Sequence, residues 1–430
     1  MTKTLILGGG LSGLALAYNL EEKKDKDYLI LEAAKKAGGL CASYTKDGFI
    51  FDYSGHLLHI ANKQTLKLLQ KLLGKNVLHH KRRAYVYFHG VKLPFPFQNN
   101  LYGLDDKFIS ECVKAALIAY KEKDIKDTQL FKNWALAQYG QAICKHFLFP
   151  YNQKLWQFDL NKMTSDWCGA FIPKTALEDI IKGAYTRRKK DFGYNANFFY
   201  PKTGGAGALA DALLSKISNI KYSSKATSLD IENKTVHAGG KSYKYNKLVS
   251  TMPLTELGKI TKKLPPQILK DFKALKHNSL YVLNLAVSGE TKDGHWYYFA
   301  EDKYPFFRVG VQSSFSPNNA PKNTSSFYIE FAFTPAQKPN TKELEKQTIA
   351  LLRELGFIEQ DSKVLVAHWL KIPVAYPIYD TKYAQAQKNI IDYMKAKGIY
   401  LLGRYGAWEY SFMEKSLLDA KALAESLENL

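Results

Sequence analysis

Three glycines near the N-terminus, Gly8, Gly10 and Gly13, constrain the fold of this chain more than any other feature. They follow a short apolar run, Thr4–Leu7, and open a segment with apolar residues at helical spacing, after which a second apolar run, Tyr28–Leu31, begins. This order predicts a β-α-β unit. In such a unit the glycines permit a tight turn and let the backbone approach a pyrophosphate, which lies at the N-terminus of the helix.

An acidic residue, Glu32, directly follows the second apolar run. It stands about 20 residues past the glycines, where a dinucleotide-binding unit places the carboxylate that accepts a hydrogen bond from the ribose. A GxGxxG motif alone is weak evidence, but the flanking strands and Glu32 together predict a bound dinucleotide. The fold class that we expect is therefore α/β, with a Rossmann-like domain.

Charge and cysteine content narrow the class of protein further. Lysine and arginine number 61 against 40 aspartates and glutamates, a formal net charge of +21 that favours anionic ligands. A hydrophobic content of 46% excludes a disordered chain, and four cysteines without a CxxC pair argue against a disulfide framework or a zinc site. We therefore expect no metal site and a reduced, cytoplasmic environment.

The same features limit the partners that we expect. The N-terminus lacks an apolar stretch long enough for a signal peptide, and no apolar run approaches the roughly 18 residues of a membrane span. The charge would also suit a nucleic-acid-binding module, but such a module needs lysines and arginines clustered with aromatic residues on one face. We expect neither a membrane span nor a nucleic-acid partner.

Apolar periodicity predicts an alternation of helices and strands after the first unit. The expected helices lie near residues 65–73, 107–121, 127–149 and 416–430. The expected strands lie within residues 221–251, 279–311, 325–334 and 398–403. The pattern therefore predicts a helical insertion between about 105 and 190, followed by an extended sheet.

A second glycine motif, Gly38-Gly39, follows Glu32, and a later glycine, Gly403, again follows an apolar strand. These features resemble the FAD-dependent amine oxidase and glutathione-reductase-like superfamily. The resemblance implies that the cofactor is FAD and that the cofactor-binding residues are Gly8, Gly10, Gly13, Glu32, Gly38, Gly39 and Gly403.

Further motifs, in order along nearly the whole chain, resemble the UDP-galactopyranose mutase family, especially its larger, eukaryotic-type branch. They are PFPFQNN (94–100), FPYNQKLW (149–156), NANFFYPKTGG (195–205), YNKLVSTMP (245–253), WYYFAEDKYPFFR (296–308), Tyr376-Pro377 and GRYGAWEY (403–410). The resemblance implies three parts. These are a discontinuous FAD-binding Rossmann-like domain over 1–80, 200–275 and 395–430, a helical insertion over 105–195, and an antiparallel substrate sheet over 80–104 and 276–394.

The resemblance also implies a reaction. Mutases of this family interconvert the pyranose and furanose rings of a nucleoside-diphosphate sugar for cell-surface polysaccharide biosynthesis, with N5 of reduced FAD as nucleophile on the anomeric carbon. His56, on the flavin-adjacent loop, and Arg308, which binds the diphosphate, are the implied catalytic residues. The implied substrate-binding residues are Phe97, Gln98, Trp156, Asn195, Tyr298, Arg308, Tyr376 and Tyr410. NADPH or NADH is the candidate reductant, without a second GxGxxG motif to bind it.

Departures from the family pattern bear on the substrate. Phe171 stands where the family has its second diphosphate arginine, and Phe95 replaces a tyrosine that helps to hold the nucleotide. Loss of one arginine contact costs on the order of 1.5–3 kcal/mol of diphosphate binding unless another cation substitutes. The candidate substitutes are Arg187, Arg188 and Lys202. A polar stretch between Lys174 and Gly193 further resembles a substrate-closing loop and predicts a lid.

An oxidase or dehydrogenase of the amine oxidase or protoporphyrinogen oxidase type is the alternative, because it shares the glycine motifs and Glu32. Such an enzyme would consume oxygen with an amine or a porphyrinogen and would not need Arg308. The sequence leaves open the nucleotide base, the sugar, the electron donor and the oligomeric state.

Overall fold

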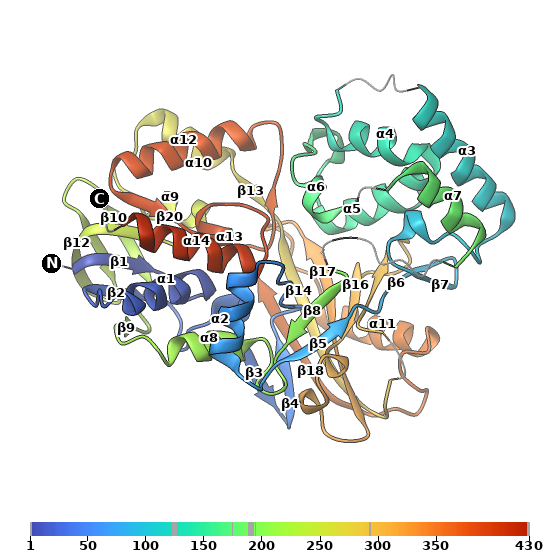
Figure 1. The fold of residues 1–430 in the computed structure, drawn as a ribbon, viewed down its shortest axis with the longest axis horizontal. Coiled ribbons are helices and arrows are strands. Elements are labelled where there is room, and N and C mark those ends of the chain that lie inside the picture. Colours follow the sequence, from blue (N-terminus) through green and yellow to red (C-terminus); the bar gives the residue numbers. More distant parts are fainter. Residues whose placement is uncertain are drawn as a thin grey trace.

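The computed structural model describes residues 2–122, 127–173, 175–187, 193, 195–291 and 294–427. The molecule has three parts (Figure 1). A parallel sheet with its helices lies at the left of the view, a cluster of helices at the upper right, and a second sheet below that cluster.

The parallel sheet contains the β-α-β unit predicted from the glycine motif, which is confirmed. Its strands are β1 (Thr2–Leu7), β2 (Tyr28–Leu31), β9 (Ile220–Lys221), β12 (Lys241–Ser250) and β20 (Ile399–Leu401). They pair in parallel in the order β20-β12-β1-β2-β9. Two further strands, β10 (Ala226–Asp230) and β11 (Thr235–Ala238), extend the first half of β12 as an antiparallel meander.

Helices cover both faces of this sheet, because successive side chains of its strands point to opposite faces. Ile6 packs in the same cluster as α1 (Leu11–Glu22), α8 (Gly207–Leu214) and α14 (Met413–Ser426), and α2 (Lys63–Leu73) packs against α8. Leu5 belongs to the cluster that contains α9 (Leu254–Ile260), α10 (Pro266–Ala274) and α12 (Tyr383–Ala396). Although α12 falls in the range 276–394 assigned to the substrate sheet, it packs on β20 and α10.

The second sheet is mixed, whereas the sequence predicted an antiparallel one. Its strands are β6 (Ala84–Phe88), β7 (Val91–Pro94), β14 (Ser279–Ser288), β15 (Trp296–Phe299), β16 (Arg308–Val311), β17 (Thr324–Phe333) and β18 (Val364–Ile372). They follow the order β18-β14-β17-β16-β15-β6-β7, and α11 (Thr341–Glu354) packs on one face. Only β15 and β6 pair in parallel among these strands, because the hairpin β6-β7 comes from a distant part of the chain.

Three short antiparallel pairs connect these parts. They are β3 (Ser43–Lys46) with β4 (Phe49–Asp52), β5 (Leu78–Lys81) with β8 (Asn197–Tyr200), and β13 (Lys276–His277) with β19 (Pro377–Ile378). A short helix, α13 (Gly403–Gly406), follows β20. The expected strand near 398–403 and the last helix are therefore both present, the latter beginning at Met413.

The predicted helical insertion is present, but its central helix is broken. The insertion contains α3 (Asp106–Glu122), α4 (Phe131–Ile143), α5 (Phe149–Trp156), α6 (Cys168–Phe171) and α7 (Leu177–Tyr185). One helix was expected over 127–149, yet a π-helical turn at Cys144–Leu148 separates α4 from α5, and Gly140 inside α4 has φ of 76°. Apolar spacing alone does not reveal such a break.

Within the described ranges, no helix combines the length and hydropathy that a membrane span requires. The four cysteines are free and buried. In the part of the chain that the structure describes, no group of three or more His, Cys, Asp and Glu side chains could hold a metal ion.

Gly140→Ala is expected to destabilise the helical insertion. A Cβ at this position would lie 2.3 Å from the carbonyl oxygen of Ala115 on α3, and the backbone is left-handed. We expect a loss of about 2 kcal/mol or more in the free energy of unfolding, since both effects oppose alanine. Gly169→Ala in α6, where a Cβ meets nothing within 4 Å, is the matched control. Equal urea midpoints for the two variants would contradict this expectation.

Candidate functional site

A cavity of about 1230 Å³ lies where the three parts meet. One side is formed by the β1–α1 turn and the segment after β2, and the other by β15, β16, β17 and the end of β18. Residues of α5 and α6 and the segment after α13 complete the lining. The cavity therefore touches all three parts of the molecule.

The glycine side of the cavity is a backbone cradle. Gly10 precedes α1 without a side-chain cap, so no side chain covers the first turn of this helix. Gly38 has φ of 114° and forms an isolated bridge with Gly10, and a Cβ on Gly39 would lie 3.1 Å from the Gly10 Cα. A Cβ on Gly13 would lie 2.0 Å from the Gly8 carbonyl oxygen. Gly13 therefore sets the close approach of α1 to β1 and does not line the cavity.

Glu32 lies at the end of β2 and lines the cavity. Its two carboxylate oxygens accept hydrogen bonds from the N–H groups of Gly9 and Ala34, each at 2.7 Å. These bonds fix the carboxylate beside the glycine turn, and its remaining lone pairs are available for a ligand hydroxyl. Gly403 does not line the cavity: its φ is 76°, and a Cβ there would lie 2.0 Å from Ser12 Oγ, so it provides close packing against α1.

Arg308, at the start of β16, lies on the other side of the cavity. Its Nε donates a hydrogen bond to Glu330 on β17, whose side chain is fully buried. Burial lowers the pKa of Arg308, but the Glu330 carboxylate outweighs this effect and raises that pKa well above its usual value. No described residue bonds the two Nη atoms of Arg308, which leaves both for a ligand.

Glu330 also holds the loop that carries His56. Ser54 donates its hydroxyl to the second oxygen of Glu330, and the Ser54 carbonyl accepts a hydrogen bond from the His56 N–H at 2.9 Å. Burial, and then the charge of Arg404, lower the pKa of His56 to about 4. The ring is therefore neutral near pH 7, and its buried Nδ1 bonds no described residue.

Tyrosine hydroxyls surround Arg308. Tyr151, Tyr298, Tyr328 and Tyr376 all line the cavity. Burial raises the pKa of Tyr151, Tyr328 and Tyr376, so these hydroxyls stay protonated and can donate hydrogen bonds. The Arg308 guanidinium lies 5.9 Å from the centroid of the Tyr328 ring. This end of the cavity is thus rich in donors, as an anion requires.

A second arginine in the lining, Arg404, is not among the site residues expected from the sequence. Its Nη atoms donate to the carbonyl oxygens of Ser411 and Ala375, both at 3.0 Å. The guanidinium lies 4.9 Å from the ring centroids of Tyr376 and Tyr410. The motif GRYGAWEY contained this residue, but its spacing gave no signal that the side chain enters the cavity.

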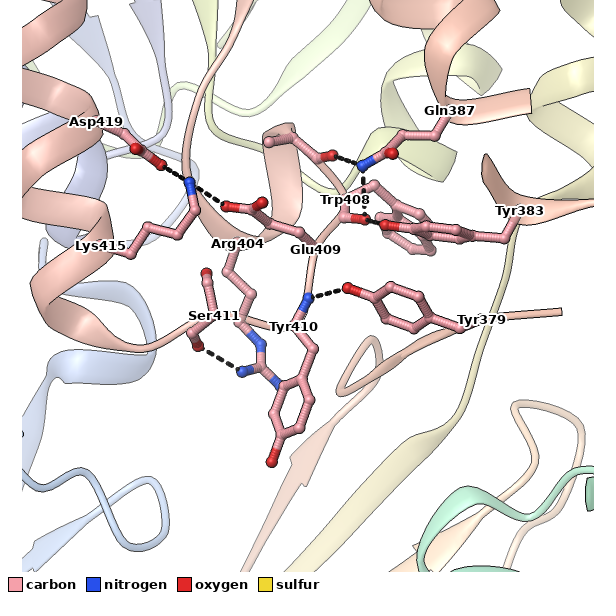
Figure 2. A network of polar contacts seen from close by, with 11 residues as sticks. Tyr379, Tyr383, Gln387, Arg404, Trp408, Glu409, Tyr410, Ser411, Lys415 and Asp419 are labelled. Carbon is pink, nitrogen blue, oxygen red and sulfur yellow. Dashed lines mark hydrogen bonds and ion pairs between the residues drawn. The ribbon is translucent and has the colours of Figure 1, made fainter. Parts of the chain in front are cut away.

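Hydrogen bonds from α12 and the segment before it fix the backbone around Tyr410 (Figure 2). Trp408 has φ of 55°, a conformation that needs support from its surroundings. Its carbonyl accepts hydrogen bonds from the Tyr383 hydroxyl and from Gln387 Nε2, the latter at 3.2 Å. The Tyr379 hydroxyl accepts a hydrogen bond from the Tyr410 N–H at 2.7 Å. These contacts hold Tyr410 beside Arg404.

The structure brings most of the expected substrate-binding residues together, but not all. Those that line the cavity are Gln98, Asn195, Tyr298, Arg308, Tyr376 and Tyr410. Phe97 and Trp156 do not line it: both are fully buried. Phe97 stacks on Phe147 with ring centroids 4.5 Å apart, and Trp156 donates its Nε1 to Asn152 at 3.1 Å. Both rings pack behind the wall of the cavity. Neighbouring residues of the same motifs face the cavity instead.

The two phenylalanines that depart from the family pattern both line the cavity. Phe171, at the end of α6, stacks on Tyr410 with ring centroids 3.7 Å apart and an interplanar angle of 21°. Phe95 packs against Tyr298, and the Arg82 guanidinium lies 5.0 Å from its ring.

The two expected substitutes for the missing arginine that the structure describes do not lie in the cavity. Arg187 and Lys202 do not line it, and Arg188 lies outside the described residues. The lid expected over 174–193 also falls largely outside the described residues and stays a prediction.

Comparison with known proteins identifies the family. Residues 11–427 match the family described as flavin containing amine oxidoreductase. The chain belongs to this family. It is 23% identical to UDP-galactopyranose mutase of Mycoplasma genitalium over 98% of this chain and 94% of that one. It is 26% identical to dTDP-fucopyranose mutase of Escherichia coli over 48% of this chain and 50% of that one.

A solved structure shares the fold along the whole chain. The crystal structure of a reduced UDP-galactopyranose mutase matches with a TM-score of 0.94 at 24% identity, over 100% of this chain and 94% of that one. The expected fold class, an α/β FAD-binding fold of the amine oxidase type, is confirmed. The eukaryotic-type branch stays a prediction.

This flavoprotein uses FAD, and the described residues fit that cofactor. Gly8, Gly10 and Gly38 line the cavity without side chains, so the backbone can lie against a pyrophosphate at the uncapped N-terminus of α1. The Glu32 carboxylate also lines the cavity, where it can accept hydrogen bonds from the ribose hydroxyls.

The pH dependence of stability tests the state of His56. Because the folded pKa of about 4 is below the usual 6.5, the unfolded chain takes up the proton first as pH falls. The contribution of His56 is therefore complete above pH 6.5 and is lost as pH falls towards 4. We expect His56→Asn to flatten the melting temperature over this range, with His237→Asn on β11 as control. Parallel profiles for wild type and His56→Asn would contradict the assignment.

Glu330→Gln tests the buried pair. Removal of one partner of a buried ion pair costs about 3–5 kcal/mol, and about 1 kcal/mol shifts the melting temperature of a large domain by 2–4 °C. Since Arg308 also faces the cavity, where solvent lowers this cost, we expect the lower end of the range, a melting temperature lower by roughly 6 °C. Arg308→Met in the same background is expected to restore part of the loss. If the changes in melting temperature caused by the two substitutions are additive, the ion pair contributes nothing to stability.

Proposed function

We propose that this flavoprotein is a mutase that interconverts the pyranose and furanose forms of a nucleoside-diphosphate sugar. The observation that carries this proposal is the placement of Arg308, whose two Nη atoms bond no described residue, among tyrosines in the same cavity as the cofactor cradle. A planar guanidinium with hydroxyl donors matches the oxygens of a diphosphate. The names of the two curated mutase relatives support the same substrate class.

When bound, reduced FAD supplies a nucleophilic nitrogen for the anomeric carbon of the sugar. Arg308 binds the diphosphate through its Nη atoms, and the hydroxyls of Tyr298 and Tyr376 donate hydrogen bonds to it. These contacts retain the leaving group beside the sugar, so that it can return after the ring has changed. His56 lines the cavity and holds no charge near pH 7.

The remaining assignments are part of the same proposal. Gln98 and Asn195 both line the cavity, and we assign Gln98 to the nucleobase and Asn195 to the sugar. NADPH or NADH would reduce the flavin from within the same cavity, since the sequence has no second GxGxxG motif. The free thiols of the four buried cysteines favour the reducing cytoplasm. Biosynthesis of a cell-surface polysaccharide is the role that we propose for the product.

An amine oxidase reaction is less compatible with this cavity. Its lining includes Arg404, which forms no ion pair with a described carboxylate, and this guanidinium would repel a protonated amine. A porphyrinogen carries carboxylates, which arginines accept, so oxygen-dependent oxidation of a porphyrinogen is the alternative that an experiment must test.

Isomer conversion by the FAD holoenzyme tests the proposal. UDP-galactopyranose and dTDP-fucopyranose are incubated with dithionite-reduced and with oxidised enzyme, and the isomers are separated by chromatography. We expect conversion by the reduced enzyme alone, and a rate about 10- to 100-fold lower for Arg308→Lys, which keeps the charge but loses the planar fork. Oxygen uptake with amines or porphyrinogens, and no isomer from either sugar, would overturn the proposal in favour of an oxidase.

A further inference from the structure

The charge at the Arg308 end of the cavity is not supplied by Arg308. Its guanidinium is bonded through Nε to the fully buried Glu330, so the two side chains together carry no net charge. His56 is neutral near pH 7, and the raised pKa values of Tyr151, Tyr328 and Tyr376 keep these hydroxyls protonated. A diphosphate would bring about two negative charges into this region, so it needs a cation that no carboxylate already neutralises.

Arg404 meets this requirement. Its Nη atoms donate to two backbone carbonyls, at Ser411 and Ala375, and no described carboxylate forms an ion pair with it. Its Nε is buried and bonds no described residue. The positive charge of Arg404 is therefore oriented by neutral acceptors and retained in full.

Arg404 and Arg308 act on the same part of the cavity. The Arg404 guanidinium lies 4.9 Å from the centroid of the Tyr376 ring. Burial, and then the charge of Glu330, raise the pKa of Tyr376, whereas the charges of Arg308 and Arg404 both lower it. His56 feels the charge of both arginines as well. A ligand held by Arg308 and Tyr376 would therefore also meet the field of Arg404.

The ring of Tyr410 holds Arg404 in this position. Phe171 stacks in parallel on Tyr410 with centroids 3.7 Å apart, which leaves no room for a guanidinium on that face. The Arg404 guanidinium, 4.9 Å from the same centroid, therefore lies on the opposite face. The residue that replaces the family's second arginine thus supports the aromatic ring against which Arg404 packs.

We propose that Arg404 supplies the uncompensated positive charge that binds the diphosphate of the substrate, in place of the arginine missing at Phe171. This inference rests on the proposed function. Arg308 then contributes directed hydrogen bonds, whereas Arg404 contributes net charge. Arg404 is a substrate-binding residue in this assignment, and Phe171 and Tyr410 are positioning residues.

Binding of UDP and of uridine to the FAD holoenzyme, measured by calorimetry, tests this division. We expect Arg404→Gln to weaken UDP about 10- to 100-fold and to leave uridine within about twofold, because only UDP carries the diphosphate. Arg404→Lys, which keeps the charge, should retain most of the preference for UDP. Phe171→Arg in the Arg404→Gln background should restore part of it.

Matched controls separate this role from a structural one. Arg353→Gln on α11, where the arginine donates to the Ser362 carbonyl outside the cavity, should change neither affinity. The FAD content of each variant is read from its visible absorbance. Equal losses of UDP and uridine affinity, no loss of UDP affinity, or loss of FAD from both Arg404→Gln and Arg404→Lys would each overturn the assignment of Arg404.

Failure of the proposed function is distinguishable from failure of this inference. A wild-type enzyme that binds UDP no more tightly than uridine would overturn the nucleoside-diphosphate substrate. Inorganic pyrophosphate, bound by wild type but not by Arg404→Gln, would still support Arg404 as the anion-binding cation in that case. Equal pyrophosphate binding by the wild type and by Arg404→Gln would overturn the assignment of Arg404, whether or not the enzyme binds a nucleotide.

Discussion

The buried carboxylate of Glu330 is the interaction on which the rest of the site depends. A fully buried carboxylate is tolerated only when hydrogen bonds and an opposite charge compensate its loss of hydration. Glu330 obtains them from Ser54, on the segment after β4, and from Arg308, its register partner across β16 and β17. One side chain of the second sheet therefore fixes both the loop before His56 and the arginine that faces the ligand.

The two sides of the cavity recognise phosphate by different means. On one side Gly8 and Gly10 present backbone without side chains beside the uncapped first turn of α1, and this is possible only because Gly13 lets the helix approach β1. On the other side guanidinium and phenol groups project from strands of the mixed sheet and from the segment after α13. The backbone cradle suits a permanently bound cofactor, while long side chains suit a diphosphate that must leave and return.

Local signals in the sequence predicted the glycine cradle. The pairings between distant segments of the chain were not predicted from the sequence. The glycine spacing and Glu32 predicted a β-α-β unit because each residue acts on its own backbone neighbourhood. The parallel pairing of β15 with β6 and the break at Gly140 depend on contacts across the chain. Phe97 and Trp156 show the same limit: a motif places a residue near the cavity, but packing decides whether it or its neighbour faces inward.

Arg404 was not predicted as a site residue for the same reason: its motif does not show that its side chain faces the cavity. Its position changes the interpretation of the phenylalanine at residue 171, where the family has an arginine. An arginine at residue 171 would lie on the helical insertion, so binding of an anion would also draw that insertion towards the ligand. Here the cation belongs to the segment after β20, where the carbonyls of Ser411 and Ala375 hold it in place. The insertion meets the same region through the apolar stack of Phe171 on Tyr410. With Arg404 as the anion-binding cation, contact of the insertion with the site no longer depends on the charge of the ligand.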